Sequence, residues 1–383
     1  MNRLGLLWIL IFINFACRFE SKQVATFSEE LHTAIPLKYA TGFSAYKNNQ
    51  GVILLTIINP WPEASKDLRY ALIPKDLKVA PDLGSARFEA VLTVPVDKVV
   101  LTSTTHIPAL EALGQIHKLV GFPGLDYISS EVTRERINQG YVTELGANER
   151  LDTEKTIALE PDVLIGFGVS GTPRSYQTIR TANIPVIFNG DWMEQNPLGK
   201  AEWIKFFGLL LGREAEAEIL FSEIESAYTD AKNLAAKAKT MPTVLSGALY
   251  RDFWYTPGGN SWGAQFLKDA HAKYLWENTQ ESGSLTLSLE AVLQQAENAD
   301  VWIAPSKFIS YAEMKESNPH YLQFEAFKNK KVFTYATAKG PTGGYLYFEL
   351  GPARPDWVLK DLIYYLHPGL LEDYEPTFFK PLR

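Results

Sequence analysis

From Lys98 onward the sequence alternates short apolar runs with helical segments, and this alternation restricts the possible folds more than any other feature. The apolar runs are KVVLT, KLVGF, DVLIGFG and IPVIFNGD, and the helical segments among them are HIPALEALG, DTEKTIALE and TPRSYQTIRTAN. Strands that alternate with helices in short units form a parallel sheet with crossover helices. The pattern therefore predicts an α/β lobe over residues 96–200.

A second run of the same kind predicts another α/β lobe over residues 241–383. Its strands are TVLSGALY, ADVWIAP and KKVFTYA, and its helices are SWGAQFLKDAH, LSLEAVLQQAEN, YLQFEAF and DWVLKDLIYYLHP. Between the lobes, residues 214–239 contain strong helix formers and neither glycine nor proline, which predicts a rod of about 39 Å. Residues 201–240 are therefore assigned to a helix that connects the two lobes.

The residues before the first lobe are expected to be rich in β-strands. TGFSAY and GVILLTIIN flank the turn cluster KNNQG, which predicts a hairpin, and LRYALIP predicts a third strand. We assign residues 18–95 to a β-rich N-terminal extension.

The first 17 residues have the features of an export signal. Arg3 is followed by LGLLWILIFINFA, an apolar run of about 13 residues, whereas a membrane-spanning helix needs roughly 20. Cys17, the only cysteine, follows a small residue as at a bacterial lipoprotein cleavage site, although Asn14 and Phe15 depart from that pattern. Residues 1–17 are therefore predicted to be a signal peptide with lipid attached at Cys17, and a plain signal peptide is the alternative. Such a protein is exported, has no disulfides and reaches the membrane only through its lipid.

The charge of the chain argues against nucleic acid as a partner. The 383 residues carry a formal net charge of -7 with a pI near 5.5, and they contain no basic stripe. Binding to a phosphate backbone requires clustered lysine and arginine.

One glycine-rich loop supports an alternative, an exported oxidoreductase that binds a nucleotide. Residues 166–171 spell GFGVSG between a strand and a helix, and Asp191 ends the next strand, as in a dinucleotide-binding motif. However, the loop follows the third strand of its lobe, and Thr172 and Pro173 delay the start of the helix.

Other catalytic patterns are weak or absent in the sequence. It has no HExxH motif, and its GxSxG match, GNSWG at residues 259–263, lies in the turn expected before a helix. Its six histidines, among them His106 and His271, do not cluster with the spacing of metal ligands. We therefore predict no enzyme, no catalytic residue, no resident cofactor and no metal site, so that any metal arrives within a ligand.

Aromatic and cationic residues gather where strands are expected to end, which predicts a cleft for a large, partly apolar ligand. Trp254 and Arg251 are the first candidates, because the pair Trp254-Tyr255, shortly before PGGN, is expected in a turn. The alternative is that most of these aromatic residues belong to the core. The other candidates are Tyr250, Tyr255, Trp262, Phe122, Tyr127, Trp192, Lys339, Tyr345 and Arg354.

Both lobes place a glutamate at the same point of a helix. Asp152 and Ser288 are suitable N-cap residues, and Glu154 and Glu290 follow each of them by two positions. Acidic side chains there complement the helix dipole, which explains each glutamate but not its repetition. The helices lead to apolar strands that are preceded by aspartates, Asp162 and Asp300.

The chain resembles the periplasmic substrate-binding proteins of ABC importers for iron–siderophores, haem and vitamin B12. KVVLTSTTHIPALEALG and LDTEKTIALEPDVLIGF resemble the first lobe of that family, and the likeness covers residues 96–368. PLGKAEWIKFFGLLLG, WYTPGGNSWGAQFLKDA and YFELGPARPDW resemble a branch assigned to iron transport in Bacteroidetes-type bacteria. The run from Ser103 to His106 departs from the Ser-Pro that the family often has after the first strand, which puts the ligand role of that loop in doubt.

The resemblance implies two Rossmann-like α/β lobes, joined by the long helix, that hold a ligand between them. It implies a monomeric periplasmic protein that captures a metal chelate, a ferric siderophore above all, and delivers it to a dimeric membrane permease. Glu154 and Glu290 match the family's permease-docking glutamates. We expect only a small movement of the lobes on binding, because a helix joins them. The alternatives are cobalamin or haem, with His106 or His271 as possible haem ligands, and a surface binding protein without an importer.

Overall fold

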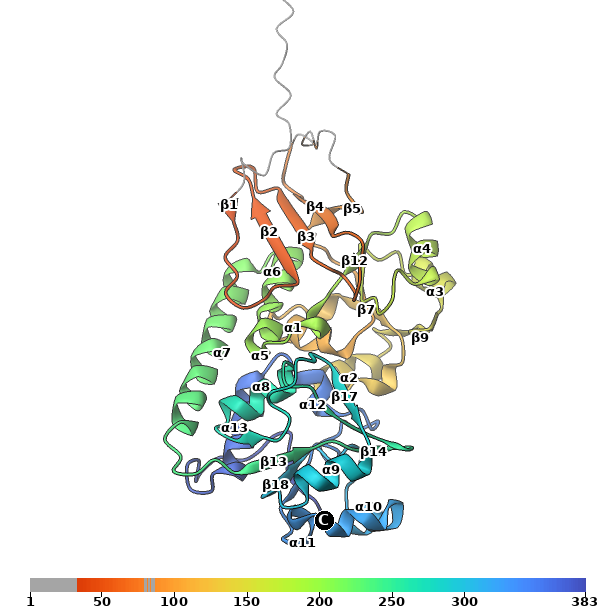
Figure 1. Ribbon diagram of the computed structural model, residues 1–383. Coiled ribbons are helices and arrows are strands. Elements are labelled where there is room, and N and C mark those ends of the chain that lie inside the picture. Colours follow the sequence, from red (N-terminus) through yellow and green to blue (C-terminus); the bar gives the residue numbers. More distant parts are fainter. Residues whose placement is uncertain (1–32, 79–80, 82, 84–86) are drawn as a thin grey trace, which may run out of the picture.

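The computed structural model describes residues 33–78, 81, 83 and 87–383, and shows two α/β lobes stacked along a long helix, α7 (Figure 1). The predicted signal peptide and Cys17 lie outside the described residues. Within the described part of the chain, no helix has the length and apolar character needed to cross a membrane.

The N-terminal lobe contains the predicted parallel sheet, in the order β12-β11-β6-β7-β8. Ile165 of β11 pairs with Leu101 on one side and Ile187 on the other, and all three side chains are buried. The strands are β6 (Val99–Leu101), β7 (Leu119–Phe122), β8 (Thr143–Glu144), β11 (Val163–Gly166) and β12 (Val186–Phe188), with the helices α1 (Ile107–Ala112), α2 (Glu131–Asn138), α3 (Thr153–Ala158) and α4 (Arg174–Thr181). The pattern did not predict α2, β8 or the small pair β9 (Gly146–Ala147) and β10 (Arg150–Leu151).

The C-terminal lobe repeats this plan in the order β16-β13-β18-β19-β20, with only β20 antiparallel. Its strands are β13 (Thr243–Ser246), β16 (Lys273–Tyr274), β18 (Val301–Ile303), β19 (Val332–Thr334) and β20 (Lys380–Pro381). Its helices are α8 (Trp262–Asp269), α9 (Leu289–Ala296), α10 (Tyr311–Ser317), α11 (Glu325–Lys328), α12 (Leu346–Leu350) and α13 (Pro355–Leu366). A three-stranded antiparallel sheet is added, in the order β14 (Ala248–Tyr250), β15 (Phe253–Pro257) and β17 (Ser284–Leu287).

The repeated aspartates have a structural role that both lobes share. Asp162 accepts hydrogen bonds from the backbone N–H groups of Asp97 and Lys98, at 2.6 and 3.0 Å, just before β6. Asp300 accepts hydrogen bonds from the N–H and the hydroxyl of Thr243, at 2.8 and 2.7 Å, at the start of β13. The N–H of Thr243 lowers the pKa of Asp300. Each aspartate, which directly precedes one strand, therefore holds the start of the neighbouring strand, β6 in the N-terminal lobe and β13 in the C-terminal lobe.

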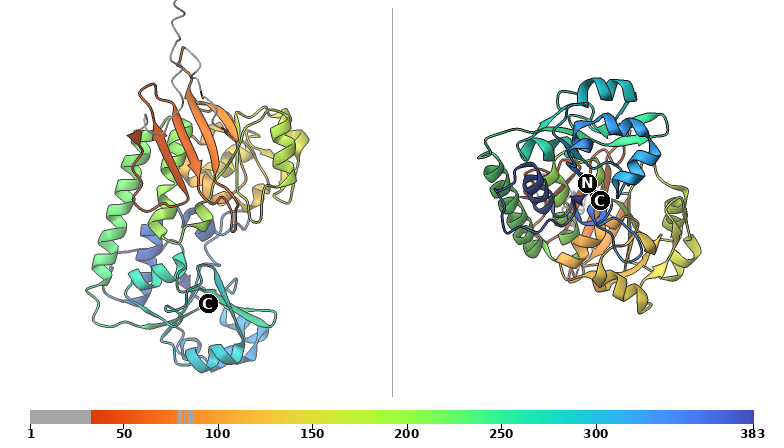
Figure 2. Two further views of the ribbon diagram at one scale, coloured as in Figure 1. Left: turned by 45° about the horizontal axis from the view of Figure 1, so that its top comes forward. Right: turned by 90° about the horizontal axis from the view of Figure 1, so that it is seen from below.

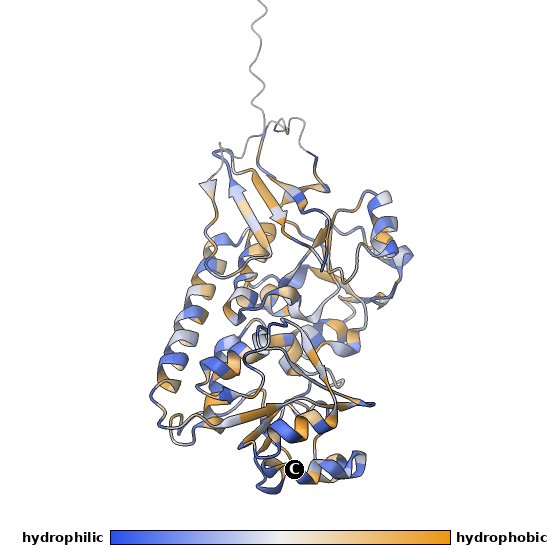
Figure 3. Ribbon diagram, in the orientation of Figure 1, coloured by the Kyte–Doolittle hydropathy of each residue, from blue (hydrophilic) through white to orange (hydrophobic). Residues whose placement is uncertain are grey.

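The connecting segment consists of three helices: α5 (Pro197–Glu202), α6 (Ile204–Leu211) and α7 (Glu214–Ala235). The 22 residues of α7 span about 33 Å and end four residues before the predicted boundary at Lys239. One face of α7 is buried: Phe221 contacts Tyr39 of the N-terminal extension, and Tyr228 contacts Phe266 of the C-terminal lobe. Tyr228 donates a hydrogen bond of 2.7 Å to Asp269 of α8, which fastens the end of α7 to the C-terminal lobe. Figure 3 shows polar and apolar residues alternating along α7, whereas the strands are mainly apolar.

The N-terminal extension forms a five-stranded sheet that packs on the N-terminal lobe (Figure 2). Its strands are β1 (Thr33–Ala34), β2 (Phe43–Lys47), β3 (Ile53–Ile57), β4 (Leu68–Pro74) and β5 (Ala90–Val94), so the predicted hairpin and third strand are confirmed. Phe43 contacts Trp203, with ring centroids 4.6 Å apart, and the Tyr70 hydroxyl accepts a hydrogen bond from the Phe188 N–H. The sheet therefore shares one hydrophobic core with the lobe instead of forming a separate unit.

Candidate functional site

The carboxyl ends of the N-terminal strands face a loop of the C-terminal lobe, and a cavity of about 280 Å³ lies between them. In parallel α/β sheets this edge is where ligands bind. We call this space the cleft cavity. Its lining residues are Thr102, Ser103, Thr104, Phe122, Pro123, Tyr127, Asn148, Phe167, Gly343, Gly344, Tyr345 and Phe348.

The cleft cavity continues into a groove along the glycine-rich loop. A second hollow, of about 460 Å³, shares Asn148 and Phe167 with the cleft cavity and is lined also by residues 169–176. A β-carbon at Gly166 would come within 2.3 Å of the Tyr176 hydroxyl oxygen, and one at Gly168 within 2.8 Å of Trp61. These glycines therefore make room for aromatic side chains of the protein itself, which is a structural reason for the motif that requires no nucleotide.

A tight hairpin carries the C-terminal residues of the cleft cavity against the other lobe. Lys339 and Tyr345 form an isolated β-bridge, and the Lys339 ammonium lies 4.9 Å from the centre of the Tyr345 ring. A β-carbon at Gly344 would come within 2.2 Å of the Tyr127 carbonyl oxygen, so only glycine allows this approach. The Thr342 hydroxyl donates a hydrogen bond of 2.8 Å to the carbonyl of Asp126.

A buried carboxylate beside this hairpin joins the two lobes. Glu349, on α12, is 2% exposed and accepts hydrogen bonds from the backbone N–H groups of Ser129 and Ser130, at 2.6 and 2.9 Å. Burial raises the pKa of Glu349 to about 7, against the opposing effect of these hydrogen bonds, and the charge of Glu111 adds to the increase. Glu349 therefore changes protonation near neutral pH at a contact between the lobes.

Glu349→Gln is expected to flatten the dependence of stability on pH. Because the folded-state pKa is raised from 4.5 to about 7, the folded protein keeps a proton that the unfolded chain releases. This contribution is fully present below pH 4.5 and is lost as the pH rises through 7, which amounts to about 3 kcal/mol at most. Urea unfolding at pH 5 and pH 8 should show this loss in the wild type and a smaller one in the variant. Equal losses in the two proteins would contradict the assignment.

Three predicted ligand residues, Phe122, Tyr127 and Tyr345, are brought together in the cleft cavity. Phe122 is buried at the end of β7, whereas Tyr127 is 72% exposed. Lys339 stands beside them through its contact with Tyr345. Their role as ligand contacts remains a prediction.

Three others lie at the tip of the antiparallel sheet and do not line the cleft cavity. Tyr250 and Tyr255 are exposed, with ring centroids 6.3 Å apart, and Arg251 lies 5.3 Å from the centre of the Tyr250 ring. The backbone of Arg251 is left-handed, with φ of 56°, because it turns the hairpin between β14 and β15.

The prediction that Trp254 lies in a turn is wrong, because this residue is part of a strand and its side chain belongs to the core. It lies within β15, not in a turn, and is 0% exposed. Its ring is 5.3 Å from that of Trp302, and its indole N–H donates a hydrogen bond of 2.9 Å to the Ser246 carbonyl. The alternation of β15 turns the neighbouring aromatic residues outward and Trp254 inward.

Trp254→Ala is expected to lower the free energy of unfolding by about 3–5 kcal/mol, because it removes a large buried side chain. Arg251→Ala, in the adjacent turn, should change it by no more than about 0.5 kcal/mol. Denaturant unfolding of both variants measures the difference. A small effect at Trp254, with ligand affinity lost, would restore the original prediction.

The remaining ligand candidates also lie outside the lining of the cleft cavity. Trp262 stacks on Tyr347, with centroids 5.8 Å apart, and lies 5.1 Å from the Lys200 ammonium. Trp192 is 40% exposed, and its carbonyl accepts a hydrogen bond from Lys200. Arg354 forms two hydrogen bonds with the carboxylate of Asp356, at 2.9 and 2.7 Å, and lines a different cavity.

The two histidines considered for haem are not placed in the cleft cavity. His106 is fully buried and its ring lies 5.6 Å from that of Phe207. Burial lowers the pKa of His106. His271 follows α8 and lies 6.1 Å from the ring of His367. Among the residues that the structure describes, no group of three or more histidine, cysteine, aspartate or glutamate side chains is arranged to hold a metal ion.

The two predicted docking glutamates are exposed on different lobes, on α3 and α9 (Figure 1). The predicted N-caps are confirmed: Asp152 accepts a hydrogen bond from the Lys155 N–H at 3.0 Å, and Ser288 accepts one from the Ala291 N–H at 3.3 Å. The backbone N–H of Glu290 lowers the pKa of its own side chain, so this carboxylate is ionised at neutral pH.

Sequence reasoning missed several lining residues of the cleft cavity. These are Asn148, Phe167, Phe348 and the hydroxyl residues 102–104. Phe348 could have been included from its position in the aromatic run after Gly344, but Asn148 precedes a strand that the pattern did not predict.

Comparison with known proteins identifies one protein family and two sequence relatives. The family model described as periplasmic binding protein matches residues 99–338. An uncharacterized lipoprotein of Methanocaldococcus jannaschii is 26% identical over 298 residues, which cover 76% of this chain and 69% of the relative. A second, uncharacterized protein of the same organism is 25% identical over 241 residues, covering 61% of this chain and 69% of the relative.

Solved structures share the fold at lower identity. A periplasmic heme-binding protein from Pseudomonas aeruginosa is 20% identical with a TM-score of 0.56, covering 75% of this chain and 98% of that one. A possible iron-binding protein from Staphylococcus epidermidis is 19% identical with a TM-score of 0.52, covering 71% and 99%. These likenesses confirm the two-lobe fold with its parallel sheets and long helix.

Proposed function

The chain belongs to the periplasmic binding protein family, and from this premise we propose that it captures a metal chelate between its lobes and delivers it to an ABC importer. The cargo is a ferric siderophore. The protein itself makes and breaks no bond.

The observation that supports this function most directly is the cleft cavity at the carboxyl ends of the N-terminal strands. Its walls offer the aromatic faces of Phe122, Tyr127, Tyr345 and Phe348, together with hydroxyl groups from residues 102–104. The ammonium of Lys339 stands at its edge. Such walls suit a ligand that is partly aromatic, carries negative charge and brings its metal already coordinated.

The contacts between the lobes support capture with little movement. The helix α7 is fastened to both lobes, and Glu349 and Thr342 bind the backbone of the N-terminal lobe directly. A ligand that enters the cleft cavity and its adjoining groove would therefore meet a largely preformed site, with local rearrangement of the hairpin at residues 339–345.

Delivery rests on Glu154 and Glu290, one exposed carboxylate on each lobe. A dimeric permease has two related surfaces, and one carboxylate for each fits that symmetry. Export with lipid at Cys17 would keep the protein near the permease, and one relative carries the name lipoprotein.

The decisive experiment is a tryptophan-fluorescence titration of the mature protein with ferric siderophores, ferric citrate, haem and cobalamin. Eight of the nine tryptophans lie after residue 17, and we expect saturable quenching at submicromolar concentrations of a ferric siderophore. Quenching by haem or cobalamin alone would keep the fold and change the cargo. No response to any chelate by the folded protein would contradict the proposed function.

Tyr345→Ala is expected to weaken binding of the chelate about 10-fold or more, because it removes an aromatic face from the cleft cavity. Phe253→Ala is the matched control, since Phe253 is an exposed aromatic residue of β15 that does not line this cavity. The same titration measures both variants. Equal affinities for the two variants would place the ligand elsewhere.

A further inference from the structure

A second cavity, of about 420 Å³, lies between the lobes on the side of α7. We call it the α7 cavity. It shares no lining residue with the cleft cavity. Its walls come from α1, from the connecting helices α5, α6 and α7, and from residues 350–357 around the start of α13. Figure 1 shows α7 at the left edge of the molecule, away from β9 and α3.

The walls of the α7 cavity are mainly apolar. Trp203, Phe207 and Trp357 supply aromatic surface, and Ile224 and Ala227 of α7 complete the wall. An apolar cavity with a few fixed polar groups is the usual form of a binding site for a small organic molecule.

One carboxylate in this cavity accepts no hydrogen bond among the described residues. Asp191 is 7% exposed and lines the cavity, and among the described residues its carboxylate accepts no hydrogen bond and forms no direct ion pair. The Lys200 ammonium, which binds the Asp191 backbone carbonyl, is near enough for its charge to act on this carboxylate. A carboxylate in the wall of a mainly apolar cavity with a free hydrogen-bonding capacity can accept a hydrogen bond from a donor group of a ligand.

The remaining charges leave the cavity negative. Glu111 and Glu223 also line it, so three carboxylates face two cations, Lys200 and Arg354. Arg354 is already paired with Asp356. Lys200 donates hydrogen bonds to the Asp191 and Trp192 carbonyls, at 2.8 and 3.0 Å, and the charges of Asp191 and Glu194 also act on its ammonium.

We propose that the α7 cavity binds an amphipathic organic cation, with a protonated amine against Asp191 and an apolar body between the aromatic walls. The Arg354 guanidinium already lies 3.7 Å from the centre of the Trp357 ring, so the aromatic walls would add apolar contact to the charge pairing. Such a ligand is unlike the anionic chelate proposed for the cleft cavity.

The position of the α7 cavity gives this ligand a regulatory role. Because both lobes and α7 form its walls, an occupant stabilises the present arrangement of the lobes. Binding in one cavity would then change affinity in the other, and the coupling is reciprocal.

The test uses three probes with one indole body: tryptamine, its alcohol tryptophol and indole-3-propionate. Isothermal titration of the mature protein should show tryptamine binding at least about 10-fold more tightly than tryptophol, because only the amine pairs with a buried carboxylate. Thermal unfolding with excess tryptamine should raise Tm by about 2 °C or more.

Two variants locate the site. Asp191→Asn is expected to remove the preference for the amine while leaving tryptophol binding unchanged. Ala227→Trp should fill the cavity and abolish binding of both probes, whereas Ser226→Trp, at the neighbouring exposed position of α7, should not. Circular dichroism verifies that each variant folds. If Ala227→Trp does not fold, the result for Asp191→Asn alone tests the location of the site.

Three results would overturn the inference. They are no binding of any probe at millimolar concentration, tighter binding of indole-3-propionate than of tryptamine, or an undiminished preference for the amine in Asp191→Asn. These results would leave the proposed chelate function untouched, because the chelate titration measures binding in the cleft cavity and not in the α7 cavity.

Discussion

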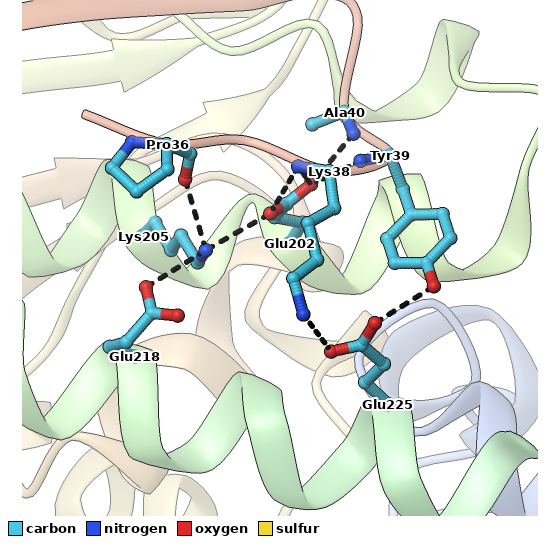
Figure 4. Close-up of polar contacts among 8 residues, drawn as sticks. All are labelled: Pro36, Lys38, Tyr39, Ala40, Glu202, Lys205, Glu218 and Glu225. Atoms are coloured by element: carbon cyan, nitrogen blue, oxygen red, sulfur yellow. Dashed lines mark hydrogen bonds and ion pairs between the residues drawn. The ribbon is translucent and has the colours of Figure 1, made fainter. Parts of the chain in front are cut away.

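Glu202→Ala is expected to lower the free energy of unfolding by about 3–5 kcal/mol, the range for removing one partner of a buried ion pair. Glu202 is 0% exposed and accepts hydrogen bonds from the N–H groups of Lys38, Tyr39 and Ala40, at 2.7 to 3.0 Å. Its carboxylate also lies 3.0 Å from the Lys205 ammonium (Figure 4). Alanine would leave three backbone donors and a buried cation without this acceptor.

Glu218→Ala is the matched control for this prediction. Glu218 binds the same Lys205 ammonium at 2.8 Å, but its side chain is 50% exposed. Its loss should therefore change the free energy of unfolding by less than about 1 kcal/mol. Guanidinium unfolding measures both variants, and limited proteolysis shows whether residues 36–42 detach. Equal effects of the two substitutions would mean that the N-terminal extension is not held by Glu202.

The alternation of strands and helices was sufficient to predict the architecture. The runs around β6, β11, β13 and β18 are short, apolar and mostly buried. Strands covered on both faces consist of continuous apolar residues, which are easily recognised in a sequence. The long helix was predicted because no glycine or proline interrupts residues 214–239, although α7 ends at Ala235.

Other elements could not be predicted because their local pattern is weak. The helix α2 is mainly polar, and β8 has only two residues, so neither shows an apolar periodicity. The helix expected at YLQFEAF is divided into a 3-10 turn (Pro319–Gln323) and the short α11, since Phe324 has extended backbone angles. In such segments, the secondary structure depends on packing against the rest of the protein and not on the local sequence.

Only part of the candidate site was predicted, because some of its residues follow from the strand order and others depend on tertiary structure. The loops after β6 and β7 follow from the strand order, which correctly brought Phe122 and Tyr127 to one edge. Whether an aromatic residue faces a cleft or the core depends on the register of its strand. Trp254 and Tyr255 are adjacent in the sequence but lie on opposite faces of β15, and composition cannot distinguish them.

The paired variant Glu154→Arg with Glu290→Arg is expected to reduce uptake of the chelate by at least about 10-fold. If both carboxylates meet arginines of the permease, each reversal places like charges together at the interface, which costs several kcal/mol of binding. Both residues are exposed and neither lines the cleft cavity, so the affinity for the chelate should not change.

Uptake of iron-labelled chelate should be measured in cells that carry only the variant protein. Glu135→Arg with Glu316→Arg supplies the control, because these are exposed helical glutamates on α2 and α10, again one on each lobe. The control pair should transport at the wild-type rate, since its charges lie outside the proposed docking positions. If the Glu154 and Glu290 pair transports equally well while binding is intact, the chain is a surface binding protein that needs no importer. Each single variant, Glu154→Arg or Glu290→Arg, should also be measured. If each one transports at a rate between those of the control pair and of the Glu154 and Glu290 pair, both lobes contribute to docking.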